Sequence, residues 1–368
     1  MDVHVADSLE DLPFSHLEWD RLVAEDPRAT VFQSRPWIEA WWASFGSSYR
    51  LSLISLTEGG RLTGLLPLIQ DKHAPQAPLQ FLGQGQADYL DLIARSEDRV
   101  RGLEAALARM TREPGWTELR LRNIPGDSET ARALPILCEK LGLWPLRGDD
   151  EVCPTLCRDG PAPSPATLLQ KYRVRRASRY FARQGRLAVR DLSDPQEARA
   201  HLSRFFEQHV RRWQGTPTPS LFDRPEKRAF YERLVESLLP AGHLLFTVAE
   251  LDGEPIAYHF GFDFKDRVIW YKPSFEPRLA RHSPGTILIE HLLRHVVRNN
   301  RLELDFTIGA EAFKDRYCNL RRSNAQFRLF RTPAQYHRAR ALDLGYRGAR
   351  AVVRRLGIAP WLRGRYPR

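Results

Sequence analysis

Apolar residues in the second half of the chain are grouped in runs typical of strands. Residues 244–251 and 256–264 have the length and composition of two strands. Asp252-Gly253 lies between them and is a strong signal for a two-residue hairpin turn. A further apolar run at 268–271 follows after a short polar gap. We therefore predict a hairpin and then a third strand.

The apolar pattern next changes to helical spacing. Ser283-Pro284 is a helix-start signal, with Ser283 as the N-cap and Pro284 at the first helical position. Apolar residues then recur at helical intervals, and Glu290 and Arg294, four residues apart, can pair on the opposite face. Asn299-Asn300 is suited to a left-handed stop. We predict a helix between these two signals.

A short strand and a polar loop follow this helix. Leu302, Leu304 and Phe306 alternate with polar residues, which is strand spacing. The turn at 307–311 would leave three polar side chains near the mouth of the strand, those of Asp305, Glu311 and Lys314.

The first half of the chain repeats this order. Its predicted elements are a hairpin (51–57 and 62–69), strand residues at 81–83 and 89–93, a helix (98–110) and a strand (116–121). Helices precede the hairpin in both halves, and ELRLRNIPG from Glu118 resembles ELDFTIGAE from Glu303. We infer an internal duplication, that is, two copies of one fold.

Composition restricts the class of protein. The 368 residues, 42% of them hydrophobic, suffice for two domains with cores of their own. No apolar run is long enough to span a bilayer, and residues 1–20 lack the apolar core of a signal peptide, so we expect a cytoplasmic protein. Four cysteines are too few for a disulfide framework. Cys153 and Cys157 have no second pair of Cys or His nearby, so we expect small apolar side chains there and no metal.

The net charge of +11 is concentrated in two segments. Residues 168–186 carry seven cations and no acid, and residues 334–368 carry nine arginines against Asp343. Such segments suit an anionic partner, which can be nucleic acid, a membrane surface or a phosphorylated substrate. In the first segment, cations four residues apart share one helical face: Lys171, Arg175, Arg179 and Arg183. That helix is either a solvated connection or a clamp for a phosphate-bearing substrate.

Four stretches carry a resemblance to a known family: WDRLVAEDPRATVFQSRPWIEAWWASFG, ADYLDLI, SPGTILIEHLL and DFTIGAEAFKDRY. Over about residues 15–330 the chain resembles the GNAT-like family of polysaccharide-biosynthesis proteins called CelD/BcsL. That family is similar to the FemABX peptidoglycan ligases, which also carry two GNAT-like domains. The resemblance implies an α/β fold of tandem duplicated GNAT-like domains, each a mixed, mostly antiparallel sheet flanked by helices.

The resemblance and the linker sequence DGPAPSP together imply four segments. These are an N-terminal GNAT-like domain (1–158), a linker with the basic helix (159–186), a C-terminal GNAT-like domain (187–333) and a basic amphipathic tail (334–368).

The GNAT resemblance implies a donor site in the second domain. In that fold acyl-CoA lies where the third strand splays from the next one, and its pyrophosphate sits on free N–H groups at the start of the following helix. The matching stretch RHSPGT departs from the usual [QR]xxGx[GA] signature, because Pro284 replaces the first Gly and has no N–H. We expect acyl-CoA, in the simplest case acetyl-CoA, as co-substrate, bound by Arg281, Ser283, Gly285 and Thr286.

Acyl transfer needs a base for the nucleophile, donors for the oxyanion and a proton for the leaving thiolate. Asp305 is the first candidate for a base or substrate clamp, and a turn-capping carboxylate is the alternative. Lys314 lies in EAFKDRY, and a lysine in a similar stretch of FemABX ligases contacts the phosphorylated substrate; the alternative is a surface lysine. Tyr317 follows three residues later and is the candidate proton donor.

Further residues are candidates for binding the acceptor: Asp88, Tyr89, Asp91, Arg175, Arg179 and Tyr271. For the first three the role is implied by the family alone.

The resemblance implies an N- or O-acyltransferase that acylates an amine or hydroxyl of a sugar-containing envelope or exopolysaccharide precursor. This acceptor would be either a small molecule or a lipid-linked sugar. One alternative is a FemABX-like transferase that uses aminoacyl-tRNA. The other is a non-catalytic accessory protein of a polysaccharide synthase. Binding of acyl-CoA, of tRNA or of neither distinguishes the three.

The tail at 336–368 has close to helical apolar spacing with many arginines. Basic amphipathic segments often lie on anionic lipid, which would place the protein peripherally at the inner membrane. The alternatives are a helix packed on the second domain and, under the FemABX-like hypothesis, an RNA contact.

Overall fold

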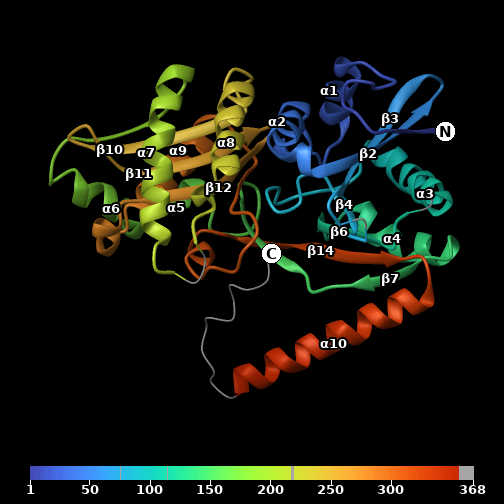
Figure 1. The fold of residues 1–368 in the computed structure, drawn as a ribbon. Coiled ribbons are helices and arrows are strands. Elements are labelled where there is room, and N and C mark those ends of the chain that lie inside the picture. The colour runs from blue at the N-terminus through green and yellow to red at the C-terminus, as the bar shows by residue number, and fades with distance from the viewer. Residues whose placement is uncertain (75, 114, 217–218, 356–368) are drawn as a thin grey trace. The chain divides into compact units, whose positions relative to one another are not determined.

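The computed structural model describes residues 1–355 except 75, 114 and 217–218, and side chains as far as residue 346. Two compact units form: unit 1 comprises Met1–Glu151 with Ser323–Arg368, and unit 2 comprises Val152–Arg322. Each unit is a twisted sheet flanked by helices (Figure 1). Among the described residues, no helix has both the length and the apolar content needed to cross a bilayer.

Unit 1 is built on a mixed sheet. Its elements are β1 (Asp2–Ala6), α1 (His16–Glu25), α2 (Arg35–Phe45), β2 (Tyr49–Glu58), β3 (Arg61–Asp71), β4 (Leu79–Phe81), β5 (Ile93–Ala94), α3 (Ser96–Arg112), β6 (Glu118–Pro125), α4 (Glu129–Lys140), β7 (Trp144–Arg147), β14 (Leu320–Phe330) and α10 (Pro333–Arg355). The strand order is β1-β2-β3-β4-β6-β14, with β5 beside β3 and β7 beside β14. Every pairing on this path is antiparallel except that of β4 with β6.

Unit 2 has the same kind of sheet. Its elements are β8 (Glu151–Cys157), α5 (Pro165–Gln170), α6 (Tyr172–Phe181), β9 (Leu187–Asp191), α7 (Pro195–Trp213), α8 (Pro225–Leu238), β10 (Leu244–Leu251), β11 (Glu254–Phe264), β12 (Arg267–Phe275), α9 (Gly285–Arg298) and β13 (Glu303–Asp305). The order is β8-β13-β12-β11-β10-β9, and only β12 and β13 are parallel.

The two units repeat one topology. In each, a strand, two helices, a hairpin, a third strand and a helix lead to a strand that is parallel to the third. The next strand comes from the other half of the sequence, because β14 pairs with β6 in unit 1 and β8 pairs with β13 in unit 2. The repeat supports the predicted duplication, and the exchange of final strands is a feature that the sequence pattern does not indicate.

Most predicted elements are present. The turn between β10 and β11 has positive φ at both Asp252 (52°) and Gly253 (86°), as the hairpin signal requires. Asn300, with φ 53°, closes α9 in the left-handed conformation expected of it. The prediction of a strand at 89–93 was wrong. Only Ile93–Ala94 forms a strand, and the preceding residues form a loop.

The basic segment differs from its prediction. It forms two helices, α5 and α6, separated at Lys171, so the four cations expected on one face do not share a single helix. Arg183 also lies beyond the end of α6 at Phe181. The predicted apolar face is confirmed, since Val174, Ala177 and Phe181 are buried.

Helices cover both faces of the unit 2 sheet. On one face, an aromatic cluster joins α7 and α8 to the hairpin through Phe205, Tyr231, Phe246 and Phe260. On the other, α9 packs against the sheet through Leu288, Leu292, Leu293 and Val296, all fully buried. Full burial of one such side chain contributes about 1.5–3 kcal/mol, so this face anchors α9 and the loop before it.

The C-terminal helix α10 belongs to unit 1. It contacts β7 near its first turn, where the ring centroids of Tyr336 and Trp144 lie 5.6 Å apart. Further along α10, Leu342, Leu344 and Tyr346 are exposed. Residues 356–368 of the predicted tail lie outside the described residues.

Candidate functional site

In unit 2 the parallel strands β12 and β13 diverge. They pair over only three residues, from Arg267 with Glu303 to Ile269 with Asp305. Beyond these pairs the chain after β13 bonds toward β8, through Phe306 N–H to Pro154 O (3.0 Å) and Gly309 N–H to Val152 O (3.0 Å). Meanwhile β12 continues to Phe275. The two strands therefore diverge as they approach the start of α9, and a side-chain bond from Thr307 Oγ1 to Trp270 O (3.2 Å) crosses the gap where it begins.

The loop after β13 is held by two of the predicted catalytic residues. Asp305 is 1% exposed and accepts the Thr307 N–H at 2.8 Å, which supports the left-handed Thr307 (φ 55°). Lys314 is 3% exposed, and its Nζ donates to the carbonyls of Ile308 (2.9 Å) and Gly309 (3.4 Å). Glu311 pairs with the same Nζ at 2.8 Å. Asp305 thus caps the turn, and Lys314 is a buried tether.

Tyr317, the third predicted catalytic residue, lies in the same region. Its side chain is buried in the unit 2 core, with its ring centroid 6.1 Å from that of Phe306. The structure therefore brings Asp305, Lys314 and Tyr317 together around one loop. Their roles in proton transfer stay predictions.

The predicted donor-binding residues lie between β12 and α9. Ser283 was expected to cap α9, and this was wrong: it has φ 56° and ends a 3-10 turn (Pro277–His282), while Pro284 occupies the N-cap position without a side-chain cap bond. A left-handed Ser283 lets its carbonyl accept the Thr286 N–H at 2.9 Å. Arg281 is exposed, and Gly285 begins the helix.

Helix α6 contacts this donor loop. Tyr180 stacks on His282 with ring centroids 3.9 Å apart, and its hydroxyl lies 3.1 Å from His282 Nε2. Arg281 Nε donates to the same nitrogen at 2.8 Å. The basic helix therefore lies beside the loop that precedes α9.

The two predicted substrate-binding arginines of α6 have different surroundings. Arg175 is half-buried and donates to Gln170 O at 3.3 Å, while the exposed Arg179 lies 5.8 Å from the Tyr172 ring centroid. Within the described part of the chain, neither side chain pairs with an acid. Both arginines can therefore interact with an anion, and Arg179 is the more solvent-exposed of the two.

In unit 1 the corresponding opening between β4 and β6 is occupied by the protein itself. These strands pair at Leu79 with Leu119 and at Gln80 with Arg120. The loop after β4 then bonds to β6: the Leu90 N–H donates to Asn123 O (3.0 Å), and Asn123 Nδ2 donates to Ala87 O (2.9 Å). This loop takes the place at which unit 2 opens.

The predicted acceptor residues Asp88, Tyr89 and Asp91 belong to that loop. Tyr89 is buried against Phe32, and the Asp88 carbonyl accepts from Asn324 Nδ2 at 2.7 Å. Asp91 is buried near Arg99, and burial raises its pKa to about 6 against the opposing effect of Arg99. These contacts are structural within unit 1, and acceptor binding by the three residues stays a prediction.

Sequence reasoning missed a group of cations at the end of β12. Arg212 Nη1 donates to Pro273 O at 2.6 Å, and its guanidinium lies 4.2 Å from the Phe275 ring centroid. Lys272 Nζ lies 3.8 Å from the centroid of the Tyr271 ring, the other predicted acceptor contact, which is itself buried. Lys227 at the start of α8 is the third member, because the charge of Lys272 acts on it.

These cations are partly desolvated. Burial lowers the pKa of Arg212 to about 10. Burial, together with the positive charges of Arg224 and Lys272, lowers the pKa of Lys227 to about 8. Like charges held close at a low-dielectric site favour an anionic ligand. The local signal was the Arg-Arg-Trp end of α7, but only the fold shows that it meets β12.

No group of His, Cys, Asp and Glu side chains in the described residues has the arrangement of a metal site.

Comparison with known proteins gives one family match. Residues 170–315 match the Acetyltransf_6 model, described as an acetyltransferase (GNAT) domain. This range includes the diverging strands β12 and β13 and the whole of α9. The matched residues lie within unit 2. Among curated proteins, none matches the chain.

Solved structures share the fold over nearly the whole chain. A FemX crystal structure is 10% identical with a TM-score of 0.63, over 89% of this chain and 97% of that chain. The C-terminal domain of a putative lysylphosphatidylglycerol synthetase from Agrobacterium fabrum is 11% identical with a TM-score of 0.54, over 92% and 97%. L-PGS from Bacillus licheniformis is 11% identical with a TM-score of 0.52, over 82% and 92%.

These findings confirm the predicted α/β fold class, with mixed sheets flanked by helices. The family match is to an acetyltransferase (GNAT) domain and covers residues 170–315. Identities this low show the fold alone, and the finer CelD/BcsL assignment stays a prediction.

Proposed function

We propose that this protein is an acyltransferase that moves an acyl group, in the simplest case acetyl, from acyl-CoA to an amine or hydroxyl. The observation that carries the proposal is the opening between β12 and β13 in the GNAT-matched region, with α9 starting beside it. The corresponding place in unit 1 is occupied by its own loop, which supports unit 2 as the donor-binding unit.

The acceptor is a sugar-containing envelope or exopolysaccharide precursor that carries an anionic group. Arg212, Lys227 and Lys272 support this acceptor class, because desolvated cations at the end of β12 would bind a phosphate or carboxylate. The acceptor nitrogen or oxygen attacks the thioester carbonyl, and the CoA thiolate leaves with the proton that the acceptor loses. Holding both substrates in line supplies most of the rate enhancement in such a site.

A FemABX-like transferase, which would use aminoacyl-tRNA, is the second candidate. The basic surface of α6 and the structural similarity to FemX favour it. A non-catalytic accessory role is the third, and it predicts that neither donor binds.

A single substitution at the start of α9 tests the donor. A Cβ at Gly285 would meet only Phe275 Cδ1 at 3.7 Å, an ordinary contact, so Gly285→Ala should fold and bind acyl-CoA like the native protein. Gly285→Asp places a carboxylate against the donor phosphates and is expected to weaken acetyl-CoA binding about tenfold or more through charge repulsion.

Calorimetric titration with acetyl-CoA, with charged tRNA as the comparison, measures this effect. Equal acetyl-CoA affinity in both Gly285 variants would place the donor elsewhere. Binding of charged tRNA alone would favour the FemABX-like candidate, and binding of neither the accessory role.

We also propose that the tail touches anionic membrane. Its exposed Leu342, Leu344 and Tyr346 lie on α10, in a segment rich in arginine. Each cation near an anionic surface contributes about 1 kcal/mol. The protein is therefore expected to float with phosphatidylglycerol vesicles at low salt and to be released at high salt. Flotation that persists after deletion of residues 336–368 would exclude the tail as the contact.

A further inference from the structure

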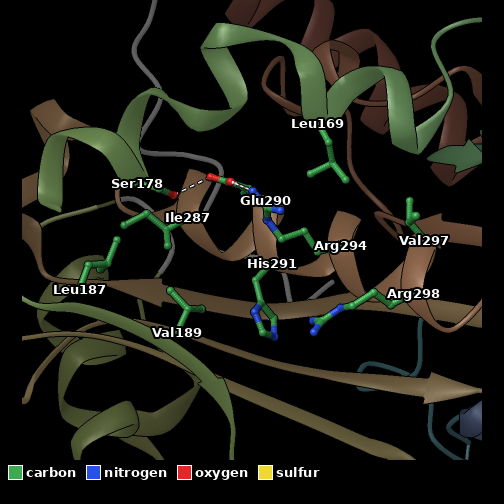
Figure 2. A pocket seen from close by; sticks show the side chains of 10 residues that line it. All are labelled: Leu169, Ser178, Leu187, Val189, Ile287, Glu290, His291, Arg294, Val297 and Arg298. Atoms are coloured by element: carbon green, nitrogen blue, oxygen red, sulfur yellow. Dashed lines mark hydrogen bonds and ion pairs between the residues drawn. The ribbon is translucent and has the colours of Figure 1, made fainter.

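A groove of about 530 Å³ lies along α9 in unit 2. Its walls come from α9, from the edge strand β9 and from α5 and α6 (Figure 2). Leu187 and Val189 line it on β9, and Ile287 and Val297 line it on α9. The volume is within the range of small-molecule sites, about 300–1,000 Å³. We call it the α9 groove.

The one carboxylate in the α9 groove is already satisfied. Glu290 is buried and accepts from Ser178 Oγ at 2.6 Å and from Arg294 Nη2 at 2.7 Å, as the dashed lines in Figure 2 show. Its negative charge is thus balanced by Arg294. A cationic ligand would find no free counter-charge at this position.

A positive charge remains at the far end of the groove. Arg298 makes no ion pair or hydrogen bond within the described part of the chain, and Figure 2 shows its guanidinium beside His291. His291 is held in place by Asp191, with Nε2 3.0 Å from a carboxylate oxygen. The groove therefore combines apolar walls with one uncompensated arginine.

The α9 groove is separate from the opening between β12 and β13. Two strands, β10 and β11, lie between β9 and β12 in the sheet. Neighbouring strands are about 4.8 Å apart, so β9 and β12 are separated by about 14 Å. The β9 wall of the groove is therefore distinct from the opening, while Ile287, on the α9 wall, lies two residues after Gly285 at the start of α9.

We propose that the α9 groove binds a single-chain anionic amphiphile, with its hydrocarbon chain against Leu187, Val189, Ile287 and Val297 and its anionic head at Arg298. Burial of each methylene contributes about 0.8 kcal/mol, which makes affinity depend on chain length. The charge of Arg298 selects an anionic head over an uncharged one.

Two neighbouring residues of β9 give a matched test. Val189 lines the groove, whereas the exposed Ala188 points to the opposite side of the strand. Val189→Glu is expected to weaken dodecanoate binding about tenfold or more, since a charge is placed among the apolar walls. Ala188→Glu adds the same charge outside the groove and should leave the affinity unchanged.

The measurement is calorimetric titration with dodecanoate below its micelle concentration, with circular dichroism to verify that each variant is folded. Native protein should bind one dodecanoate, bind octanoate more weakly, and bind dodecyl maltoside much more weakly. Arg298→Gln should remove the preference for the charged head, and dodecyl phosphate shows whether carboxylate or phosphate is favoured. The proposal would be overturned if the native protein did not bind dodecanoate, or if both Glu variants lost affinity for it to the same extent.

Discussion

Truncation after Ser323 is expected to unfold unit 1 and leave unit 2 folded. The deleted part of β14 lies between β6 and β7 and buries Ala325, Phe327, Leu329 and Phe330. Burial of each large side chain among these contributes about 1.5–3 kcal/mol, and whole domains are stable by only about 5–15 kcal/mol. Loss of this strand also exposes the backbone groups of β6 and β7 that it satisfies.

The fluorescence of buried tryptophans reports on this unfolding. Trp19, Trp37 and Trp41 are fully buried in unit 1 and should become solvent-exposed in the truncated protein. Proteolysis should cut throughout residues 1–151 and spare 152–322. Deletion of 347–368 alone is the control, because it keeps β14 and the contact of Tyr336 with Trp144. Native-like tryptophan burial in the longer deletion would show that β14 is dispensable.

Replacement of Lys314 with methionine is expected to lower both stability and turnover. The change removes the donor shared by the Ile308 and Gly309 carbonyls. A buried carbonyl without a partner costs about 1–3 kcal/mol, so the loop after β13 should loosen. A loosened loop no longer holds one side of the opening in place, and we expect turnover to fall about tenfold or more.

Glu311→Gln is the matched control. Glu311 is 58% exposed, so loss of its ion pair with Lys314 should change stability by about 0–1 kcal/mol and leave the carbonyl contacts intact. Thermal unfolding and steady-state rates with acetyl-CoA would be compared for the three proteins. A Lys314→Met protein with native melting temperature and native rate would show that the tether supports neither the loop nor the reaction.

Local signals predicted elements that depend on a few neighbouring residues. Asp252-Gly253 adopts positive φ because the hairpin turn requires it, and Asn300 ends α9 for the same kind of reason. The apolar face of α6 was also predictable, since Val174, Ala177 and Phe181 follow helical spacing. In each case the conformation depends on interactions between residues that are close together in the sequence.

Other features depend on partners far away in sequence. Lys314 is the kind of residue that usually lies at the surface, and it is buried here only because the loop after β13 presents carbonyls to it. In the sequence, Arg212 simply lies at the end of an amphipathic helix. Only the fold brings Pro273 and Phe275 of β12 beside it. Ser283 lost its expected capping role because the preceding 3-10 turn imposes a left-handed backbone on it.

The sequence by itself determined the two repeated sets of strands and helices, because periodicity and turn chemistry are local. Only the tertiary structure decided that β14 completes the sheet of unit 1 and β8 that of unit 2. A strand carries the same alternating pattern whichever sheet it joins, and its partner is chosen by long-range hydrogen bonds and packing. The opening between β12 and β13 was decided in the same way, since it exists because the chain after β13 bonds to β8.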